Sequence, residues 1–289
     1  MTPASVLDPQ LVEVLLSPLV LAVFGLCIGS FLNVVIHRLP LMLESGWRRE
    51  SAEMLDVKID EAAALTLSKP RSRCPSCGHE IAWHENIPVL SYVRLRGRCS
   101  ACKTPISLRY PFVEVFTGVL FAAVGWHFGA APTALLWCSF CAVLVALAAI
   151  DWDTTLLPDN MTLPLLWAGL VASALGWTIP LGDALWGAVA GYLSLWSVYW
   201  LFKLTTGKEG MGYGDFKLLA ALGAWLGVKM VLPILLAASI IGAIVGIGMK
   251  MISALREGRY VPFGPFLAGA GLVVLFAGPA RVLGWLGWA

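Results

Sequence analysis

Residues 143–151 read VLVALAAID, so a run of eight apolar side chains stops directly at an aspartate. A second aspartate ends the tetrapeptide Gly212-Tyr213-Gly214-Asp215, and another apolar run follows it. A carboxylate at the edge of a membrane segment is costly to hold, so it indicates a functional site. Asp151 and Asp215 can act together as an acid/base pair only if both lie on the same side of the bilayer.

The composition is that of a membrane protein. The chain has 289 residues, of which 58% are hydrophobic and 13% are charged, whereas soluble domains are about 45–50% apolar. A helix needs about 20 apolar residues to cross a bilayer core of ~30 Å. The sequence therefore predicts an all-α polytopic membrane protein of about eight transmembrane helices. They fall in runs 14–36, 115–150 (two passes), 160–182, 184–202, 218–228, 230–249 and 260–280.

Basic residues are concentrated in three segments. Residues 38–110 contain 12 Lys and Arg, while 203–217 and 250–259 contain three each. Because cytoplasmic loops are enriched in Lys and Arg, eight spans would place these segments in the cytoplasm and both termini outside. Asp151 and Asp215 would then share the cytoplasmic face. The net charge of +2 gives no reason to expect a nucleic-acid partner.

Three parts follow from this topology. We expect a first transmembrane helix in residues 1–37, a cytoplasmic insert in 38–110 and a seven-helix membrane bundle in 111–289. Within the insert, residues 44–67 mix charged and apolar side chains with weak periodicity. This pattern is compatible with a helix on the membrane surface and equally with a solvated helix or a linker.

The insert contains a metal-binding pattern. Cys74 and Cys77 form one C-x2-C pair, Cys99 and Cys102 form a second, and 21 residues separate the pairs. Four thiolates at this spacing favour a tetrahedral zinc site over a pair of disulfides, which are rare on the reducing cytoplasmic side. A closed four-cysteine site leaves no open position for substrate. We therefore expect the zinc to be structural.

The two aspartates suit peptide hydrolysis. When two carboxylates share one proton, the ionised group activates water and the protonated group polarises the carbonyl. Gly212 and Gly214 would let a substrate strand approach Asp215, although the same loop can simply lead into a helix that Asp215 caps. Asp151 is the favoured partner because it directly follows the apolar run. The other candidates are Asp153, which lies further into the loop, and Asp159, whose structural role would be to cap the next helix. Glu114 starts another span, where it either faces the bundle interior or reaches the interface.

The segment Gly212-Tyr213-Gly214-Asp215-Phe216-Lys217 resembles the type IV prepilin peptidases, a bacterial family of Gly-x-Gly-Asp intramembrane aspartic proteases. The likeness extends to Gly29-Ser30-Phe31-Leu32-Asn33-Val34, the four cysteines, Glu85-Asn86-Ile87-Pro88, Arg109-Tyr110-Pro111 and Leu156-Leu157-Pro158-Asp159. It covers roughly residues 25 to 230. The family's two catalytic aspartates map onto Asp151 and Asp215, whereas residues 41–68 match no family motif.

The resemblance implies two activities at a bacterial inner membrane, with the active site facing the cytoplasm. One is cleavage of the short, positively charged leader of type IV prepilins and type II secretion pseudopilins, after a glycine. The other is N-methylation of the new terminal residue, usually phenylalanine, with S-adenosylmethionine. No Gly-x-Gly-x-x-Gly fingerprint indicates the residues that bind the methyl donor.

Two other functions compete with the peptidase. Intramembrane acids also serve proton-coupled transporters, although these often carry inverted repeats and none is evident here. A non-catalytic assembly platform could use the cysteine module as a docking surface. The sequence does not indicate the oligomeric state or which aspartate holds the proton.

Overall fold

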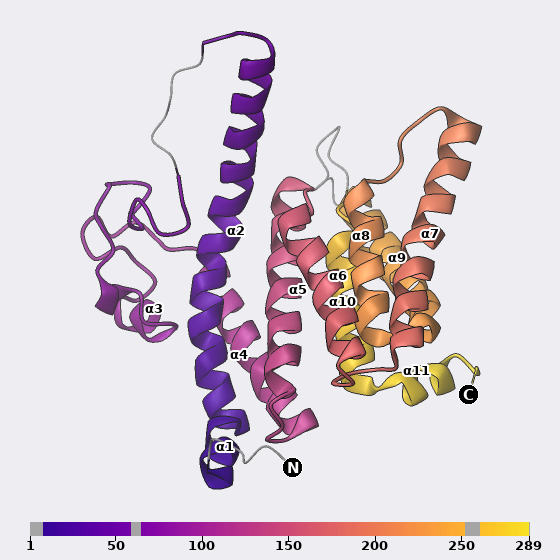
Figure 1. The fold of residues 1–289 in the computed structure, drawn as a ribbon. Helices are drawn as coiled ribbons and strands as arrows, with labels where there is room; N and C mark the ends of the chain where they lie inside the picture. The colour runs from indigo at the N-terminus through magenta and orange to yellow at the C-terminus, as the bar shows by residue number, and fades with distance from the viewer. Residues whose placement is uncertain (1–7, 59–64, 252–260, 289) are drawn as a thin grey trace. The chain divides into compact units, whose positions relative to one another are not determined.

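The computed structural model describes residues 8–58, 65–251 and 261–288, which form helices joined by loops and contain no strand (Figure 1). The chain divides into two compact units, Met1–Ala142 and Val143–Ala289. The first contains α1 (Pro9–Leu15), α2 (Pro18–Met54), η1 (Trp83–Glu85), α3 (Leu90–Arg94) and α4 (Arg109–Phe128); α5 (Ala134–Thr154) crosses the division. The second contains α6 (Asp159–Ala174), α7 (Leu181–Thr206), α8 (Tyr213–Leu226), α9 (Val228–Met251), α10 (Gly264–Ala277) and α11 (Pro279–Trp285).

The predicted all-helical membrane architecture is confirmed at the level of a multi-pass protein. Among the described residues, α2, α4, α5, α7 and α9 are long and apolar enough to cross a membrane. A sixth span results if α10 and α11 count as one broken segment. The run 260–280 was expected to be one span, but Gly278 has a φ of +83° and the two helices meet at 109°. The count of eight stays a prediction.

α2 extends well beyond the predicted first span. It contains 37 residues, which at about 1.5 Å per residue is far longer than a ~30 Å hydrocarbon core. The helix continues through Pro40, and its charged end carries an ion pair between Arg48 and Glu44 at 2.6 Å. Of the alternatives for 44–67, the helical one is confirmed for 44–54, which are continuous with α2, and the linker is excluded there. Residues 59–64 lie outside the described part.

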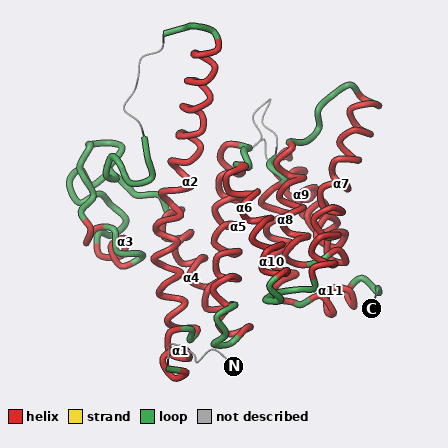
Figure 2. Tube along the Cα trace, viewed as in Figure 1, coloured by secondary structure: helices red, strands yellow, loops and turns green. Residues whose placement is uncertain are grey.

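Glycines bring α2 and α4 together within the first unit. A Cβ on Gly25 would lie 2.8 Å from the Thr117 carbonyl oxygen, and a Cβ on Gly29 would lie 2.7 Å from the Glu114 Cα. Small residues four apart let helix backbones approach closely in membranes, where packing drives association. The chain between α2 and α4 is mostly loop, with η1 and α3 as its short helices (Figure 2). Arg38 of α2 anchors this loop by donating to the carbonyl oxygens of Thr66 and Pro70.

α8 is the core of the second unit. Every residue from Asp215 to Leu226 is buried except Lys217, and α8 lies among α6, α7, α9 and α10 (Figure 1). A helix that is apolar on all sides is surrounded by protein or by lipid, and α8 is surrounded by protein. The Trp225 indole donates to the Leu165 carbonyl oxygen at 2.8 Å. Gly187 and Gly223 place the backbones of α7 and α8 in direct contact.

We predict that Gly187→Ala destabilises the second unit by about 1–3 kcal/mol, because the added methyl group would overlap the Gly223 carbonyl. Gly182→Ala is the matched control: it lies on the same helix, and no atom of the described residues lies within 4 Å of a Cβ placed there. Thermal unfolding in detergent should show a lower midpoint for Gly187→Ala only. Equal midpoints for the two variants would contradict the close crossing.

Candidate active site and metal centre

Asp215 lies in the first turn of α8 and is 8% exposed. Gly212 is the N-cap, so the preceding loop is extended and the helix starts at Tyr213. The positive end of the helix dipole favours an anion in the first turn. Within the described residues, the Asp215 Oδ1 atom is buried and has no hydrogen-bond partner. That oxygen is therefore available to a water molecule or a substrate.

Asp151 lies in the last turn of α5 and is 5% exposed. The C-terminal end of a helix disfavours an anion. The N-terminus of α10 offsets this, because the Gly264 backbone N–H donates to the Asp151 Oδ2 atom at 2.9 Å. A side chain at position 264 would overlap the carboxylate, since a Cβ there would lie 2.6 Å from Oδ2.

The two aspartates converge around Leu157. This side chain packs against Gly214 on one side, where a Cβ would lie 2.6 Å from the Leu157 Cβ, and against Gly264 on the other. One leucine thus touches both the glycine before Asp215 and the glycine that binds Asp151. The two carboxylates are also near enough to interact electrostatically. The structure brings together the residues that the sequence predicts as an acid/base pair.

The two loop glycines differ in their surroundings. Gly214 is required by the contact with Leu157, whereas no described atom lies within 4 Å of a Cβ placed on Gly212. Among the described residues, therefore, only the Gly214 part of the predicted glycine loop is packed at the start of α8.

The other candidate acids have different surroundings. Asp159 was expected to cap its helix, but it is the first residue of α6 and its two oxygens accept from the Lys217 ammonium at 2.6 and 2.7 Å. This ion pair ties the start of α6 to the first turns of α8. Asp153 is half-buried. Glu114 lies in the first unit, where it is buried and accepts from the Val89 N–H at 2.8 Å.

Gly264 is the residue that our sequence reasoning missed. Its only local signal is the sequence Pro262-Phe263-Gly264-Pro265, which marks a turn into a helix. The hydrogen bond to Asp151 joins residues 113 positions apart, so no local pattern could assign it.

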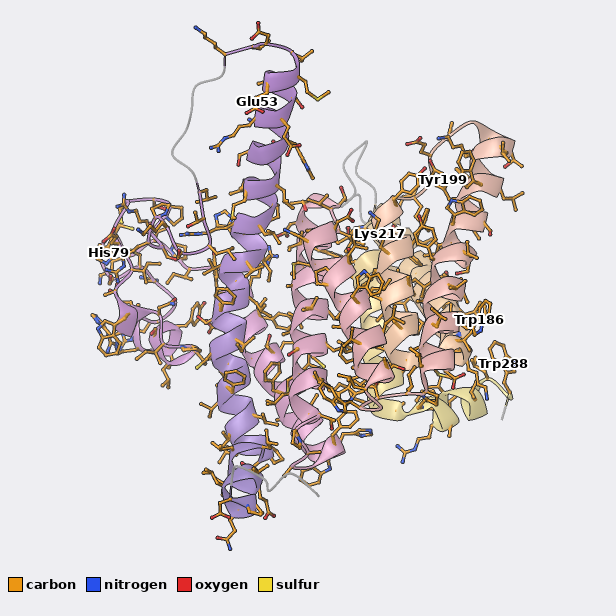
Figure 3. All side chains as sticks on the ribbon, in the orientation of Figure 1. Glu53, His79, Trp186, Tyr199, Lys217 and Trp288 are labelled. Atoms are coloured by element: carbon orange, nitrogen blue, oxygen red, sulfur yellow. The ribbon has the colours of Figure 1, made fainter. Side chains whose placement is uncertain are left out.

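The side chains at the two ends of the second unit differ (Figure 3). Tyr199 and Lys217 lie at the end where α8 begins, which is the end of the two aspartates. Trp186 and Trp288 lie at the opposite end, and they are 63% and 49% exposed. Exposed tryptophans are typical of a membrane interface.

The four cysteines gather as the sequence predicts, and they could hold a metal ion. Their sulfur atoms all lie within 4.8 Å of one another. Cys74 and Cys102 are 3.7 Å apart, and Cys77 and Cys99 are 4.0 Å apart. A tetrahedral ion with metal–sulfur distances of about 2.3 Å requires sulfur–sulfur distances of about 3.8 Å. The described geometry fits such an ion.

Each cysteine pair lies on the same kind of turn. The Cys74 N–H donates to the His79 carbonyl oxygen, and the Cys99 N–H donates to that of Thr104, both at 2.9 Å. The residue after each pair has a positive φ, +73° at Gly78 and +61° at Lys103. The two halves of the site are therefore built alike.

Glu85 connects the two turns. It accepts from the Ala82 N–H at 2.9 Å and lies 3.2 Å from His79 Nε2, which also lies 3.2 Å from Ser100 Oγ. The hydrogen bond with the Ser100 side chain, followed by that from the Ala82 backbone N–H, lowers the pKa of the Glu85 carboxyl to about 2. The His79 imidazole is thus engaged by Glu85 and Ser100.

We predict that Glu85→Ala speeds metal loss from the four-cysteine site several-fold, because it unlinks the two turns that hold the ligands. Glu80→Ala, which removes only an exposed ion pair with Arg73, is the control and should leave the rate unchanged. The rate of transfer to a coloured chelator, with total metal measured by mass spectrometry, reports the difference. Identical rates would show that Glu85 does not support the site.

Comparisons with known proteins agree with this geometry. Residues 23–128 match the Bacterial Peptidase A24 N-terminal domain, and residues 138–247 match the Type IV leader peptidase family. The chain is 50% identical over 295 residues to the prepilin leader peptidase/N-methyltransferase of Stutzerimonas stutzeri, covering 100% of this chain and 99% of that protein.

Two further relatives carry the same name. The Aeromonas hydrophila protein is 54% identical over 88% of this chain and 89% of its own length. The Pseudomonas aeruginosa protein is 52% identical over 88% of each. No solved structure matches the chain. From the domain matches and from identity along the whole length, the chain belongs to the type IV leader peptidase family.

Proposed function

We propose that this protein is a bifunctional processing enzyme for type IV prepilins and type II secretion pseudopilins. It cleaves the leader peptide after a glycine and then methylates the new terminal residue, usually phenylalanine. The observation that carries the proposal is the convergence of Asp151 and Asp215 around Leu157. The relatives that match the whole chain are named for both activities.

The hydrolysis needs only the two carboxylates and a water molecule. The ionised carboxylate takes a proton from water while the oxygen of that water bonds to the scissile carbonyl carbon. The protonated carboxylate donates its proton to the carbonyl oxygen, so a neutral tetrahedral intermediate forms. The C–N bond then breaks as the newly protonated aspartate gives its proton to the leaving nitrogen. The ionised aspartate takes a proton from a hydroxyl of the intermediate as the carbonyl re-forms, so the pair again holds one proton.

Each aspartate has a separate structural support in this reaction. The Gly264 N–H binds Oδ2 of Asp151, which leaves Oδ1 of that carboxylate for the reaction. The unpartnered Oδ1 of Asp215 can bind water or the carbonyl. The ion pair between Asp159 and Lys217 holds the start of α6 against α8. It thereby keeps in place the loop of residues 155–158, which leads from α5 into α6.

Methylation requires S-adenosylmethionine, which transfers its methyl group to the new amino terminus. The cleaved substrate must present that amine within the same membrane protein. We assign no residue to the methyl donor. The order of the reactions follows from chemistry, because the amine exists only after the peptide bond has been cut.

The protein lies in the bacterial inner membrane in this proposal, with eight spans and the aspartate pair facing the cytoplasm. α6, α8 and α10 contain 16, 14 and 14 residues, so they are the short spans. The close packing of α8 within its unit reduces its contact with lipid, which makes a short span tolerable. The Lys- and Arg-rich segments give the orientation.

The four-cysteine module would hold structural zinc through Cys74, Cys77, Cys99 and Cys102. The sulfur spacing supports this choice, because all four ligand positions of a tetrahedral ion are filled. A loop-rich segment of this size has little apolar core of its own, so the ion would supply much of its stability.

We predict that Asp151→Asn and Asp215→Asn each lower leader cleavage by about 100-fold or more, since each removes one half of the acid/base pair. Asp153→Asn is the control and should retain cleavage. Purified protein, a prepilin and the methyl donor are incubated together, and the product is weighed by mass spectrometry. Both inactive variants should still methylate a peptide whose leader has already been removed.

The same variants distinguish the rival functions. An assembly platform with no catalytic role would leave leader cleavage unchanged in Asp215→Asn. A proton-coupled transporter would lose substrate flux across vesicles rather than cleavage. Loss of cleavage in Asp153→Asn but not in Asp151→Asn would reassign the partner of Asp215.

A further inference from the structure

An apolar groove lies between α7, α9 and the start of α10, all within the second unit. Its volume is about 450 Å³, and its lining includes Leu195, Val198, Leu236, Ala243, Phe263 and Phe266. Pockets that enclose small ligands span about 300–1,000 Å³, so this groove has room for several side chains. A Cβ on Gly242 would lie 3.1 Å from the Phe266 ring, so the lack of a side chain at this position lets the ring pack against α9.

The groove begins at the two backbone segments that carry the aspartates. Phe263 lines it, and the next residue is Gly264, whose N–H binds Asp151. Met211 also lines it, and the next residue is Gly212, beside which no described atom packs. A peptide bond held between the two carboxylates would thus lie within a few residues of the groove.

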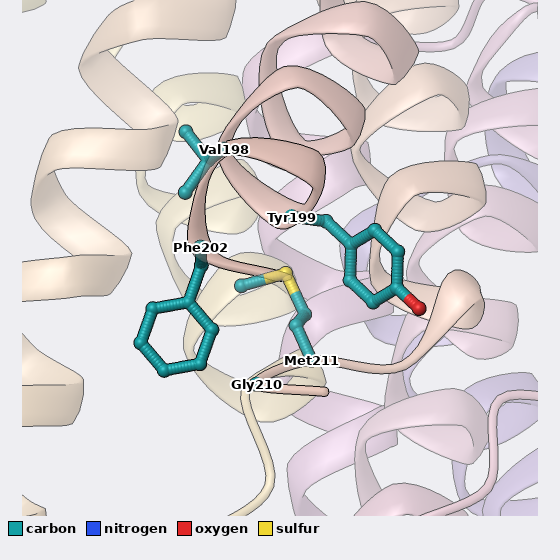
Figure 4. Close-up of a pocket in the computed structure, with 5 residues that line it drawn as sticks. All are labelled: Val198, Tyr199, Phe202, Gly210 and Met211. Atoms are coloured by element: carbon teal, nitrogen blue, oxygen red, sulfur yellow. The ribbon is translucent and has the colours of Figure 1, made fainter. Parts of the chain in front are cut away.

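A smaller hollow continues from the groove (Figure 4). Its volume is about 170 Å³, and it shares Val198 and Met211 with the groove. The Met211 side chain points back toward α7, between the rings of Phe202 and Tyr199 in this view (Figure 4). Methionine is unbranched and adapts to differently shaped apolar groups, so Met211 can adjust to an occupant.

The lining selects the chemistry of the occupant. Among the described residues that line the groove, Ser239 alone has a polar side chain and none is charged. A charged peptide segment would lose its hydration there with no partner to replace it. α7 and α9 are both candidate spans, and the groove lies between their facing middle turns, so an apolar chain already in the membrane can enter it.

We propose that this groove is the substrate subsite that binds the apolar, membrane-embedded part of the substrate adjoining the cleaved bond. The proposal rests on the peptidase function proposed above. The groove aligns the chain so that its scissile bond reaches Asp151 and Asp215, and it sets the preference for large apolar side chains next to that bond. The residues that determine this preference are Met211, Ala243 and Phe263.

Ala243→Phe tests the subsite because it fills the groove without touching either aspartate. We expect KM for a purified prepilin to rise roughly tenfold or more while kcat changes little, since the lost contact is made equally before and during the reaction. Ala168→Phe is the matched control, because Ala168 is exposed on α6 and does not line the groove. The control should keep the wild-type KM.

A substrate series sharpens this result. Replacing the large apolar residues that adjoin the cleaved bond by alanine should raise KM for the wild type and for Ala168→Phe, but hardly for Ala243→Phe. An unchanged side-chain preference in Ala243→Phe would overturn the subsite and leave the peptidase function intact.

Photocrosslinking tests occupancy independently of cleavage. A benzophenone side chain at position 243 in Asp215→Asn should capture the prepilin through its apolar segment, and the same probe at position 168 should not. Capture of lipid alone, or of the leader, by the probe at 243 would contradict the proposal. If the probe captures the prepilin but the wild-type protein does not cleave it, the peptidase function is contradicted and the groove remains a binding site.

Discussion

The need to hold two carboxylates inside an apolar helical bundle shapes the second unit. Each carboxylate meets the N-terminus of a helix, Asp215 in the first turn of α8 and Asp151 through the Gly264 N–H of α10. Helix N-termini supply unpaired N–H groups and positive potential, so they offset part of the desolvation cost. The meeting of the ends of α5, α8 and α10 is thus the constraint from which the proposed chemistry follows.

The same meeting explains why small residues recur nearby. Gly264 must lack a side chain to reach Asp151, and Gly214 must lack one to pack against Leu157. Gly187 in α7 likewise lets the backbone of α7 contact the backbone of α8 at Gly223. These contacts fix α8 on several sides, whereas no described atom packs beside Gly212 at its start.

Local patterns were enough to predict the aspartates and the cysteine module. Asp151 stands out because an apolar run ends there, and the cysteines stand out because two turns of the same kind have the same spacing. The sequence did not predict that the first span and the charged segment form one helix, because their composition changes between them. Charge marks the end of the membrane segment, whereas the backbone continues through Pro40 to Met54. Gly264 depends on a contact across 113 residues, so only the fold reveals it.

The most direct test of the account is the distance between positions 151 and 215. Cysteines replace both aspartates, and bifunctional thiol reagents of increasing length are applied before peptide mapping. The account predicts that the shortest reagents join positions 151 and 215, whereas cysteines at 153 and 215 require longer ones. Efficient single labelling at both positions, with a crosslink formed only by long reagents, would contradict the convergence of the two carboxylates.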